Sequence, residues 1–233
     1  MGGSSFAAET AGAGGFATAG PCLVLAGPTA SGKSALAAAL ARALGGEVVN
    51  ADSMQVYRDL SILTARPAAA EMGGVPHHLY GVLAGNEICA AGMWLAWMQR
   101  LLPEIWGRGR LPVVVGGTGL YLRALIEGLA PVPQVPADAR AAAAADYDRL
   151  GPAAFAAQLA ALDPVSAAEI PPGNRQRMIR AMEVARATGR PLSAWQEMPH
   201  LGGLSRPPVT VLIEPARDWL YDRCDRRFLA MLE

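Results

Sequence analysis

The most conspicuous shortage in this sequence is lysine. Of its 20 basic residues, 19 are arginine, and Lys33 is the sole lysine. An ammonium group is a compact point charge, whereas a guanidinium group is a planar fork, so the two are not interchangeable where the geometry is tight. We therefore expect Lys33 to have a specific local role.

Cysteine is also scarce. The three residues Cys22, Cys89 and Cys224 lie far apart and form no CxxC pair. Their spacing argues against a zinc site and favours reduced thiols in a cytoplasmic protein. No run of about 18 apolar residues occurs, so no membrane span is expected. The net charge is zero, and any nucleic-acid site must therefore be a local basic surface.

The first 20 residues are mostly Gly, Ala, Ser and Thr. They lack the basic start and the continuous apolar stretch of a signal peptide, which predicts a flexible leader over residues 1–20. Hydrophobic residues make up 52% of the 233 residues and charged residues 17%. This composition supports a packed core and excludes wholesale disorder.

Short apolar runs alternate with helix-forming segments in most of the chain. We expect buried strands at 22–26, 47–50, 111–115 and 209–213, with helices beginning near residues 35, 120 and 217. This alternation predicts an α/β fold, in which helices cover both faces of a parallel sheet.

Between residues 131 and 206 the strand-like runs disappear. Asp163 followed by Pro164 indicates a helix start, and Asn174 can cap a helix that Gly189 ends. We interpret 131–206 as a helical insertion domain in an α/β core made of 21–130 and 207–233.

One segment matches the phosphate-binding pattern G-x-x-x-x-G-K-S. It consists of Gly27, Pro28, Thr29, Ala30, Ser31, Gly32, Lys33 and Ser34. In such a P-loop, backbone N–H groups wrap a phosphate at the start of a helix. Lys33 reaches the terminal phosphate, and the Ser34 hydroxyl ligates Mg²⁺. The pattern predicts a P-loop NTPase-like sheet and explains the lone lysine, but it does not specify the reaction.

Two further polar segments follow predicted strands. Asp52 comes after the second strand, and Thr118 comes after the third. Ligands collect outside the carboxyl ends of parallel strands, so we expect these segments to converge with the P-loop. On position alone, Asp52 could be a helix N-cap, and Gly116 with Gly117 could serve only a tight turn.

Several segments together resemble the bacterial tRNA dimethylallyltransferase (IPP transferase) family. The matching segments are 27–34 (GPTASGKS), 51–58 (ADSMQVYR), 76–79 (PHHL), 116–121 (GGTGLY), 162–164 (LDP) and 174–184 (NRQRMIRAMEV). They occur in the family's order and spacing. The resemblance runs from about residue 21 to the last residue.

The resemblance implies the following chemistry. The P-loop would hold the diphosphate of dimethylallyl diphosphate, with Arg223 contributing to that site. Asp52 would be the general base for N6 of the adenosine 3′ of the anticodon (position 37). Thr118 would contact this adenosine or the reacting centre, and Lys33 and Mg²⁺ would stabilise the departing diphosphate. The enzyme would be a cytoplasmic monomer.

The resemblance also implies contacts with the tRNA anticodon stem-loop. These would involve Asp52, Ser53, Met54, Gln55, Thr118, Arg140, Gln176, Arg177, Met178, Ile179 and Arg180. Without the resemblance, the basic residues among 176–180 would indicate an ordinary solvated helix face. His77 and His78 are interpreted as structural, because no metal-binding pattern surrounds them.

The sequence departs from the family pattern at three places. Leu63 stands where the family usually has glycine, and Gly92, Met93 and Trp94 replace a common Asp-Phe pair. Family members also continue beyond the position of Glu233, so the resemblance implies that the C-terminal part of the core is missing.

Three other functions are compatible with part of this pattern. A P-loop kinase of small metabolites shares the strand–loop–helix start but has no need for the segments at 52–55 and 116–121. An adenylate prenyltransferase has similar core motifs but needs no helical insertion. A non-enzymatic P-loop module that binds RNA does not need Asp52 beside the phosphate site.

Overall fold

The computed structural model describes residues 15–16 and 20–232, which form two compact units. The α/β unit contains the described residues up to Gly128 and from Gly202 onwards, and the helical unit contains Leu129–Leu201. Sequence reasoning placed the insertion at 131–206. Apart from residues 15, 16 and 20, the predicted leader lies outside the described residues.

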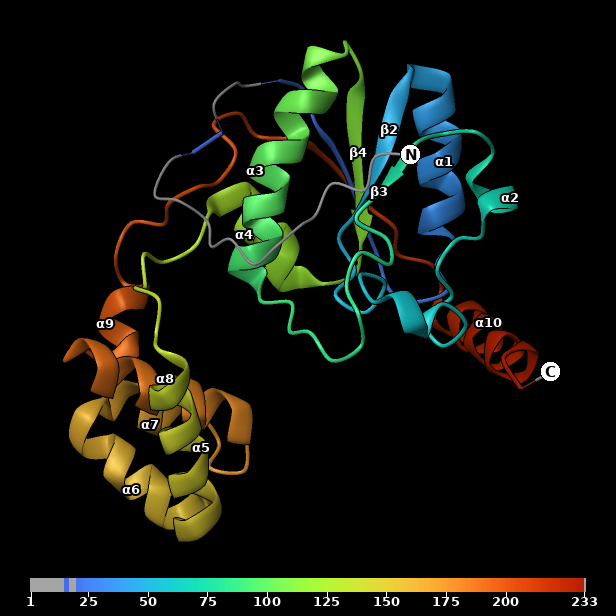
Figure 1. Ribbon diagram of the computed structural model, residues 1–233. Helices are drawn as coiled ribbons and strands as arrows, with labels where there is room; N and C mark the ends of the chain where they lie inside the picture. The colour runs from blue at the N-terminus through green and yellow to red at the C-terminus, as the bar shows by residue number, and fades with distance from the viewer. Residues whose placement is uncertain (1–14, 17–19, 233) are drawn as a thin grey trace. The chain divides into compact units, whose positions relative to one another are not determined.

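The α/β unit alternates strands and helices along most of its length (Figure 1). Its elements are β1 Leu23–Ala26, α1 Lys33–Leu44, β2 Gly46–Asn50, the 3₁₀-helix Arg58–Leu60, α2 Ala69–Met72, β3 His77–His78, α3 Ala91–Gly107, β4 Leu111–Gly116, α4 Gly119–Glu127, β5 Val209–Leu212 and α10 Arg217–Ala230.

The five strands form one parallel sheet in the order β3-β2-β4-β1-β5. In the register, Leu23 of β1 lies between Val113 of β4 and Val209 of β5. Because all the strands run the same way, their carboxyl ends meet at one edge. That edge is where a parallel α/β sheet binds its ligands.

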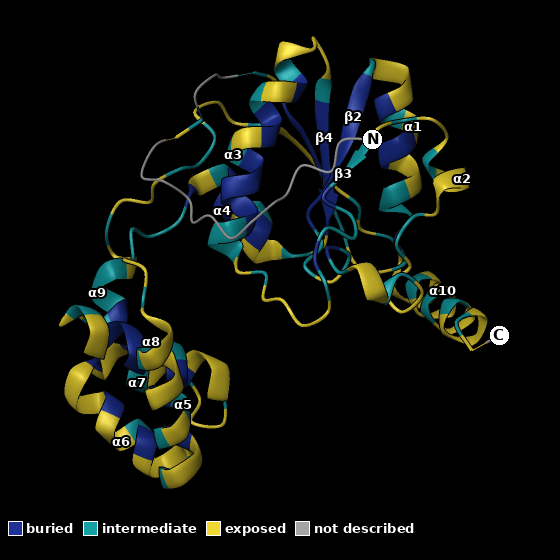
Figure 2. Ribbon diagram, in the orientation of Figure 1, coloured by how far each residue is buried: buried dark blue, intermediate teal, exposed yellow. Residues whose placement is uncertain are grey.

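Alternate side chains of the strands point to opposite faces of the sheet. Leu25 and Val113 pack with α1 on one face, whereas Val24 and Val114 pack on the other face with Trp97 of α3. Burial is deepest in the central strands and in α3 (Figure 2). The expected parallel sheet with helices on both faces is thus confirmed.

The helical unit contains five helices. They are α5 Ala137–Leu150, α6 Pro152–Leu162, α7 Pro164–Glu169, α8 Arg175–Thr188 and α9 Leu192–Gln196. Its core includes Phe155, Leu159 and Met182, each with no exposed surface. Apolar packing of this kind stabilises helices that would be marginal alone.

The caps expected in this unit are present. The Asn174 side chain accepts from the backbone N–H of Arg177 at the start of α8, and Gly189 ends α8 in the left-handed conformation. Asp163 caps α7 and also accepts from the Ser193 N–H and hydroxyl, at 3.1 and 2.6 Å. This buried carboxylate therefore joins the starts of α7 and α9, and its hydrogen bonds hold its pKa below the usual value although burial opposes this.

Among the described residues, none of the helices is both long and apolar enough to cross a membrane.

Candidate functional site

The P-loop connects β1 to α1. Gly32 adopts a φ of 86° immediately before the first helical residue, which a side chain would disfavour. The Lys33 ammonium donates to the carbonyl of Pro28 at 2.9 Å, so its side chain folds back across the loop. The lone lysine therefore lies at the start of a helix, where an anion is stabilised by N–H groups and the helix dipole.

Close contacts hold the P-loop in shape. A Cβ on Gly27 would lie 3.0 Å from the carbonyl oxygen of Ile213 and 3.1 Å from Oγ of Ser31. Ala30 adopts a φ of 62°, a left-handed conformation that is unfavourable for alanine. The Arg223 guanidinium donates from Nε to the Ala30 carbonyl at 2.8 Å, which secures that conformation.

A polar cavity of about 180 Å³ adjoins the P-loop. It is lined by residues 29–35, Asp52, Gln55, Thr64, Ala65, Arg223 and Arg227. Burial lowers the pKa of Lys33, the Asp52 carboxylate opposes this shift, and the nearby Arg227 guanidinium adds to it. Three cationic side chains therefore meet at one cavity, as an anionic ligand requires.

The loop carrying Asp52 is organised by Asn50, which is fully buried. The Asn50 amide donates to the carbonyl groups of Asp52 and Leu79, and its oxygen accepts from the Asp52 N–H. Asp52 Oδ1 accepts from the N–H of Met54 at 2.9 Å. Within the described residues, Oδ2 accepts no hydrogen bond, so this oxygen is available as a proton acceptor.

Thr118 follows β4 and lies beside the same loop. Its Oγ1 accepts from the Ser53 N–H at 2.9 Å and lies 3.3 Å from Ser53 Oγ. A Cβ on Gly116 would lie 2.1 Å from the Ala51 carbonyl oxygen, so glycine is needed for the two strand ends to approach. The segments after β2 and β4 therefore converge, as expected.

The departures from the family pattern have different structural consequences. Trp94 is fully buried, stacks on Tyr121 with ring centroids 4.7 Å apart, and donates to the carbonyl of Asn50. It thus supports the end of β2. The Leu63 side chain is 68% exposed and does not line the polar cavity.

A second hollow, of about 450 Å³, adjoins the first P-loop residues, Gly27 and Pro28. It is lined mainly by apolar groups and glycine: Ala26, Gly27, Pro28, Gly116, Gly117, Gly119, Leu122, Leu212, Glu214 and Pro215. The carboxyl edge of the sheet therefore offers an anion-binding cavity and an adjoining apolar surface.

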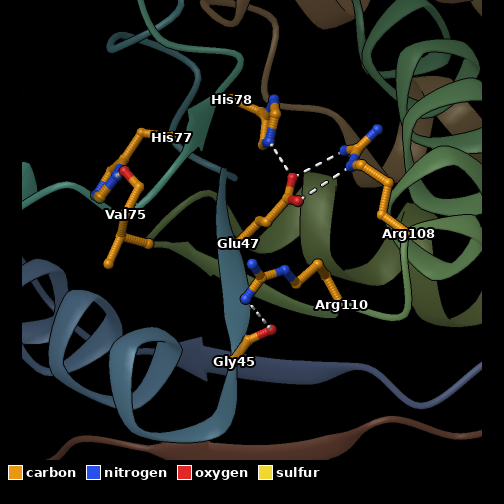
Figure 3. A network of polar contacts seen from close by, with 7 residues as sticks. All are labelled: Gly45, Glu47, Val75, His77, His78, Arg108 and Arg110. Atoms are coloured by element: carbon orange, nitrogen blue, oxygen red, sulfur yellow. Dashed lines mark hydrogen bonds and ion pairs between the residues drawn. The ribbon is translucent and has the colours of Figure 1, made fainter.

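His77 and His78 have structural partners (Figure 3). His78 Nε2 lies 2.7 Å from Glu47 Oε2, and Arg108 binds the same carboxylate with two hydrogen bonds. His77 Nδ1 contacts the Val75 carbonyl. Burial alone would raise the pKa of Glu47, but the hydrogen bonds from Arg108 and His78 hold it below its usual value.

The remaining candidate residues belong to the helical unit. Gln176 and Arg177 are exposed at the start of α8, and Arg180 is partly exposed one turn later. The side chains of Met178 and Ile179 are instead buried in the core of the unit. The expected RNA contact therefore narrows to the three polar side chains of 176–180, together with Arg140 on α5.

The arrangement fits a magnesium ion bound mainly by a ligand and water. The Ser34 hydroxyl lines the polar cavity, and Mg²⁺ prefers oxygen ligands of this kind. The described residues contain no cluster of three or more His, Cys, Asp or Glu suited to a metal ion. A protein-only cage is thus absent from that part of the chain.

Sequence reasoning missed Arg227. It lies four residues after Arg223, so on a helix the two share a face. That spacing could have indicated Arg227. However, residues 222–227 are mostly charged, and such a pattern is typical of a solvated helix surface.

Comparison with known proteins identifies relatives throughout the chain. The family model described as IPP transferase matches residues 55–233, and the model described as isopentenyl transferase matches residues 22–80. The tRNA dimethylallyltransferase of Parvibaculum lavamentivorans is 57% identical over 214 residues, which cover 92% of this chain and 68% of that protein. That of Phenylobacterium zucineum is 53% identical, covering 90% of this chain and 67% of that protein.

Solved structures agree with these sequence matches. A eukaryotic dimethylallyltransferase acting on tRNA is 28% identical with a TM-score of 0.76, and the match covers 91% of this chain and 52% of that one. The tRNA isopentenylpyrophosphate transferase of Bacillus halodurans is 38% identical with a TM-score of 0.56, covering 91% and 66%. The chain thus spans about two thirds of the length of its curated relatives.

Proposed function

The chain belongs to the IPP transferase family of prenyl-transferring enzymes that modify tRNA, and from this premise we propose its donor, acceptor and catalytic residues. The donor is dimethylallyl diphosphate. The acceptor is N6 of the adenosine 3′ of the anticodon in tRNA. The convergence of Lys33, Arg223 and Arg227 with the Asp52 carboxylate at one cavity carries this assignment.

The diphosphate occupies the polar cavity. Backbone N–H groups at the start of α1 and the three cationic side chains face its oxygens. Such preorganised donors stabilise negative charge where it develops, without reorganisation during the reaction. The apolar hollow beside Gly27 and Gly117 offers a surface for the hydrocarbon part of the donor.

The reaction exchanges one bond for another. The bond between the allylic carbon and the diphosphate oxygen breaks, and N6 forms a bond to that carbon. The proton leaving N6 passes to Asp52 Oδ2, and diphosphate departs with the bonding electrons. An aromatic amine is a weak nucleophile, so a positioned carboxylate assists by accepting this proton as attack proceeds.

Two other groups assist this step. Thr118 holds the Asp52 loop through Ser53 and contacts the adenosine. Ser34 would hold Mg²⁺, which would supply positive charge to the leaving diphosphate.

The acceptor reaches the site as an unstacked base. Anticodon-loop bases can be extruded at lower cost than duplex bases. We assign Ser53, Met54 and Gln55 to the neighbourhood of this base, since they follow Asp52 directly. Arg140, Arg177 and Arg180 contact the anticodon stem-loop, because guanidinium groups pair well with phosphates. Gln176 contacts it through the hydrogen-bonding groups of its side-chain amide.

The decisive experiment is transfer of a labelled prenyl group to an anticodon stem-loop. Wild type is compared with Asp52→Ala and with Asp59→Ala, a matched aspartate that accepts from the N–H of Gly85 and does not line the polar cavity. We expect Asp52→Ala to lower transfer by about 10²- to 10⁴-fold while the donor still binds. Asp59→Ala should retain transfer.

Two outcomes would contradict the proposal. Phosphoryl transfer from ATP without prenyl transfer would favour the small-metabolite kinase. Prenylation of free AMP but not of the stem-loop would favour the adenylate prenyltransferase. We also propose that the enzyme acts as a monomer in the cytoplasm with its tRNA substrate, which sedimentation of the purified protein and fractionation of cells would test.

A further inference from the structure

Glu183 is an unusual residue in the helical unit because a carboxylate lies in its core. Its side chain is 1% exposed, between Met182 and Val184, which are themselves fully buried. A buried charge is costly unless it is paired and hydrogen-bonded. The partners of Glu183 therefore indicate what the charge does.

Both oxygens of Glu183 bind arginines, and these come from different helices. Oε2 accepts from Nε of Arg140 on α5 at 3.1 Å, and Oε1 accepts from Nη1 of Arg180 on α8 at 2.7 Å. The Arg140 and Arg180 side chains remain 53% and 39% exposed. One buried carboxylate thus holds two guanidinium groups that still face solvent.

A guanidinium group has five N–H donors, and these contacts use only one on each arginine. The other donors remain available for an external acceptor such as phosphate. Immobilising a long side chain lowers affinity, and a side chain already fixed in the free protein avoids this loss. Arg140 and Arg180 are also two of the residues assigned above to the tRNA stem-loop.

We propose that Glu183 is a positioning residue for tRNA binding, which orders Arg140 and Arg180 in the geometry that phosphate groups meet. This inference rests on the proposed function of the helical unit. Glu183 itself touches no RNA, because its side chain is buried.

The direction in which RNA affinity changes on substitution of Glu183 distinguishes a positioning role from a simple effect of charge. Glu183→Gln removes a negative charge, so electrostatics alone predicts equal or tighter RNA binding. Positioning predicts weaker binding, by about fivefold to tenfold for two freed side chains. Affinity for a labelled anticodon stem-loop is measured by fluorescence anisotropy, and affinity for dimethylallyl diphosphate should be unchanged.

Asp148→Asn is the matched control. Asp148 also pairs with an arginine of α8, Arg175, but its side chain is 62% exposed. Its replacement removes the same charge without freeing Arg140 or Arg180. We therefore expect Asp148→Asn to bind the stem-loop at least as tightly as wild type.

Two further variants guard against loss of folding. Glu183→Asp keeps the charge but is one methylene shorter, so it cannot reach both guanidinium groups, and binding should weaken with the net charge unchanged. In an Arg140→Ala background, Glu183→Gln should have a smaller effect, since part of its action passes through Arg140. Circular dichroism verifies that each variant is folded.

A spectroscopic measurement needs no RNA. NMR relaxation of the Arg140 Nε–H group should show a restricted side chain in wild type and a mobile one in Glu183→Gln. Unchanged order, or stem-loop binding by Glu183→Gln as tight as wild type, would overturn the positioning role alone. Failure of the wild-type chain to bind the stem-loop would instead contradict the proposed function, and the positioning role with it.

Discussion

The two units use arginine in different ways. At the polar cavity of the α/β unit, Lys33 and Arg223 donate to backbone carbonyl groups, and no ion pair among the described residues includes them or Arg227. In the helical unit five of the seven arginines are instead matched with carboxylates. The ion pairs there are Arg140 and Arg180 with Glu183, Arg149 and Arg186 with Asp146, and Arg175 with Asp148.

This difference fits the functions proposed for the two surfaces. A cavity for a small anion needs uncompensated positive charge, and carbonyl groups can orient cations without neutralising them. A surface that meets a long polyanion can keep carboxylates, because they fix the direction of the guanidinium groups. The net charge of the whole chain is zero and therefore indicates neither arrangement.

The largest expected effect tests the unpaired positive charge at the polar cavity. Lys33→Ala should lower kcat/KM for the donor by about 10³-fold, because a preorganised charge on the leaving group is lost. Lys33→Arg should fail to restore it, since a planar fork does not fit the position of an ammonium. Steady-state prenyl transfer measures both. Activity of Lys33→Arg near wild type would show that only the charge matters.

The next effect concerns the scaffold of the helical unit. Asp163→Ala should destabilise this unit by about 3 kcal/mol, because the donors of Ser166 and Ser193 lose a buried partner. Hydrogen exchange should show that α7 and α9 open while the central sheet stays protected. Equal loss of protection in both units would contradict the prediction that Asp163 stabilises the helical unit alone.

Adjacent arginines on α10 give a smaller and sharper contrast. Arg227 lines the polar cavity, whereas Arg226 forms an ion pair with Asp222 one turn earlier on the helix. Arg227→Ala should raise KM for the donor by about tenfold, whereas Arg226→Ala should leave it unchanged. Equal effects of the two substitutions would mean that α10 contributes only a general positive field.

The smallest expected effect is a pH dependence that arises at Glu47, near the start of β2. The pKa of Glu47 is held below its usual value by Arg108, the C-cap residue of α3, and by His78 of β3. The carboxylate therefore stabilises the fold above the unfolded pKa of about 4.3, and this contribution is lost as the pH falls through the folded-state pKa. Urea unfolding of Glu47→Gln should show a weaker acid dependence than wild type. Identical acid dependence in the two proteins would show that Glu47 does not contribute to it.

The sequence was most informative where local patterns decide the structure. The strands β1, β2, β4 and β5 follow short apolar runs, although β5 is exposed at the sheet edge and not buried as expected. The predicted caps at Asp163, Asn174 and Gly189 depend on neighbouring residues alone. The P-loop pattern also identified residues 29–34, which line the polar cavity, whereas Gly27 and Pro28 line the apolar hollow instead. These features need no knowledge of distant contacts.

The missed features depend on tertiary contacts. Helix α3 was not predicted, because five successive residues in its first half, 94–98, are all buried and hide the amphipathic period there. Strand β3 has only two residues and exists through pairing with β2. The link between Arg140 and Glu183 spans 43 residues, so no local pattern indicates it.

The hydrogen bond from Arg223 to Ala30 has a thermodynamic consequence. Helix α10 has no buried residue, so this contact with the P-loop is a main part of its attachment. Donor binding at the P-loop and ordering of α10 are then linked equilibria, and each must favour the other to the same extent. A bound phosphate ligand would stabilise the position of α10, and the ordered helix would in turn slow dissociation of the ligand.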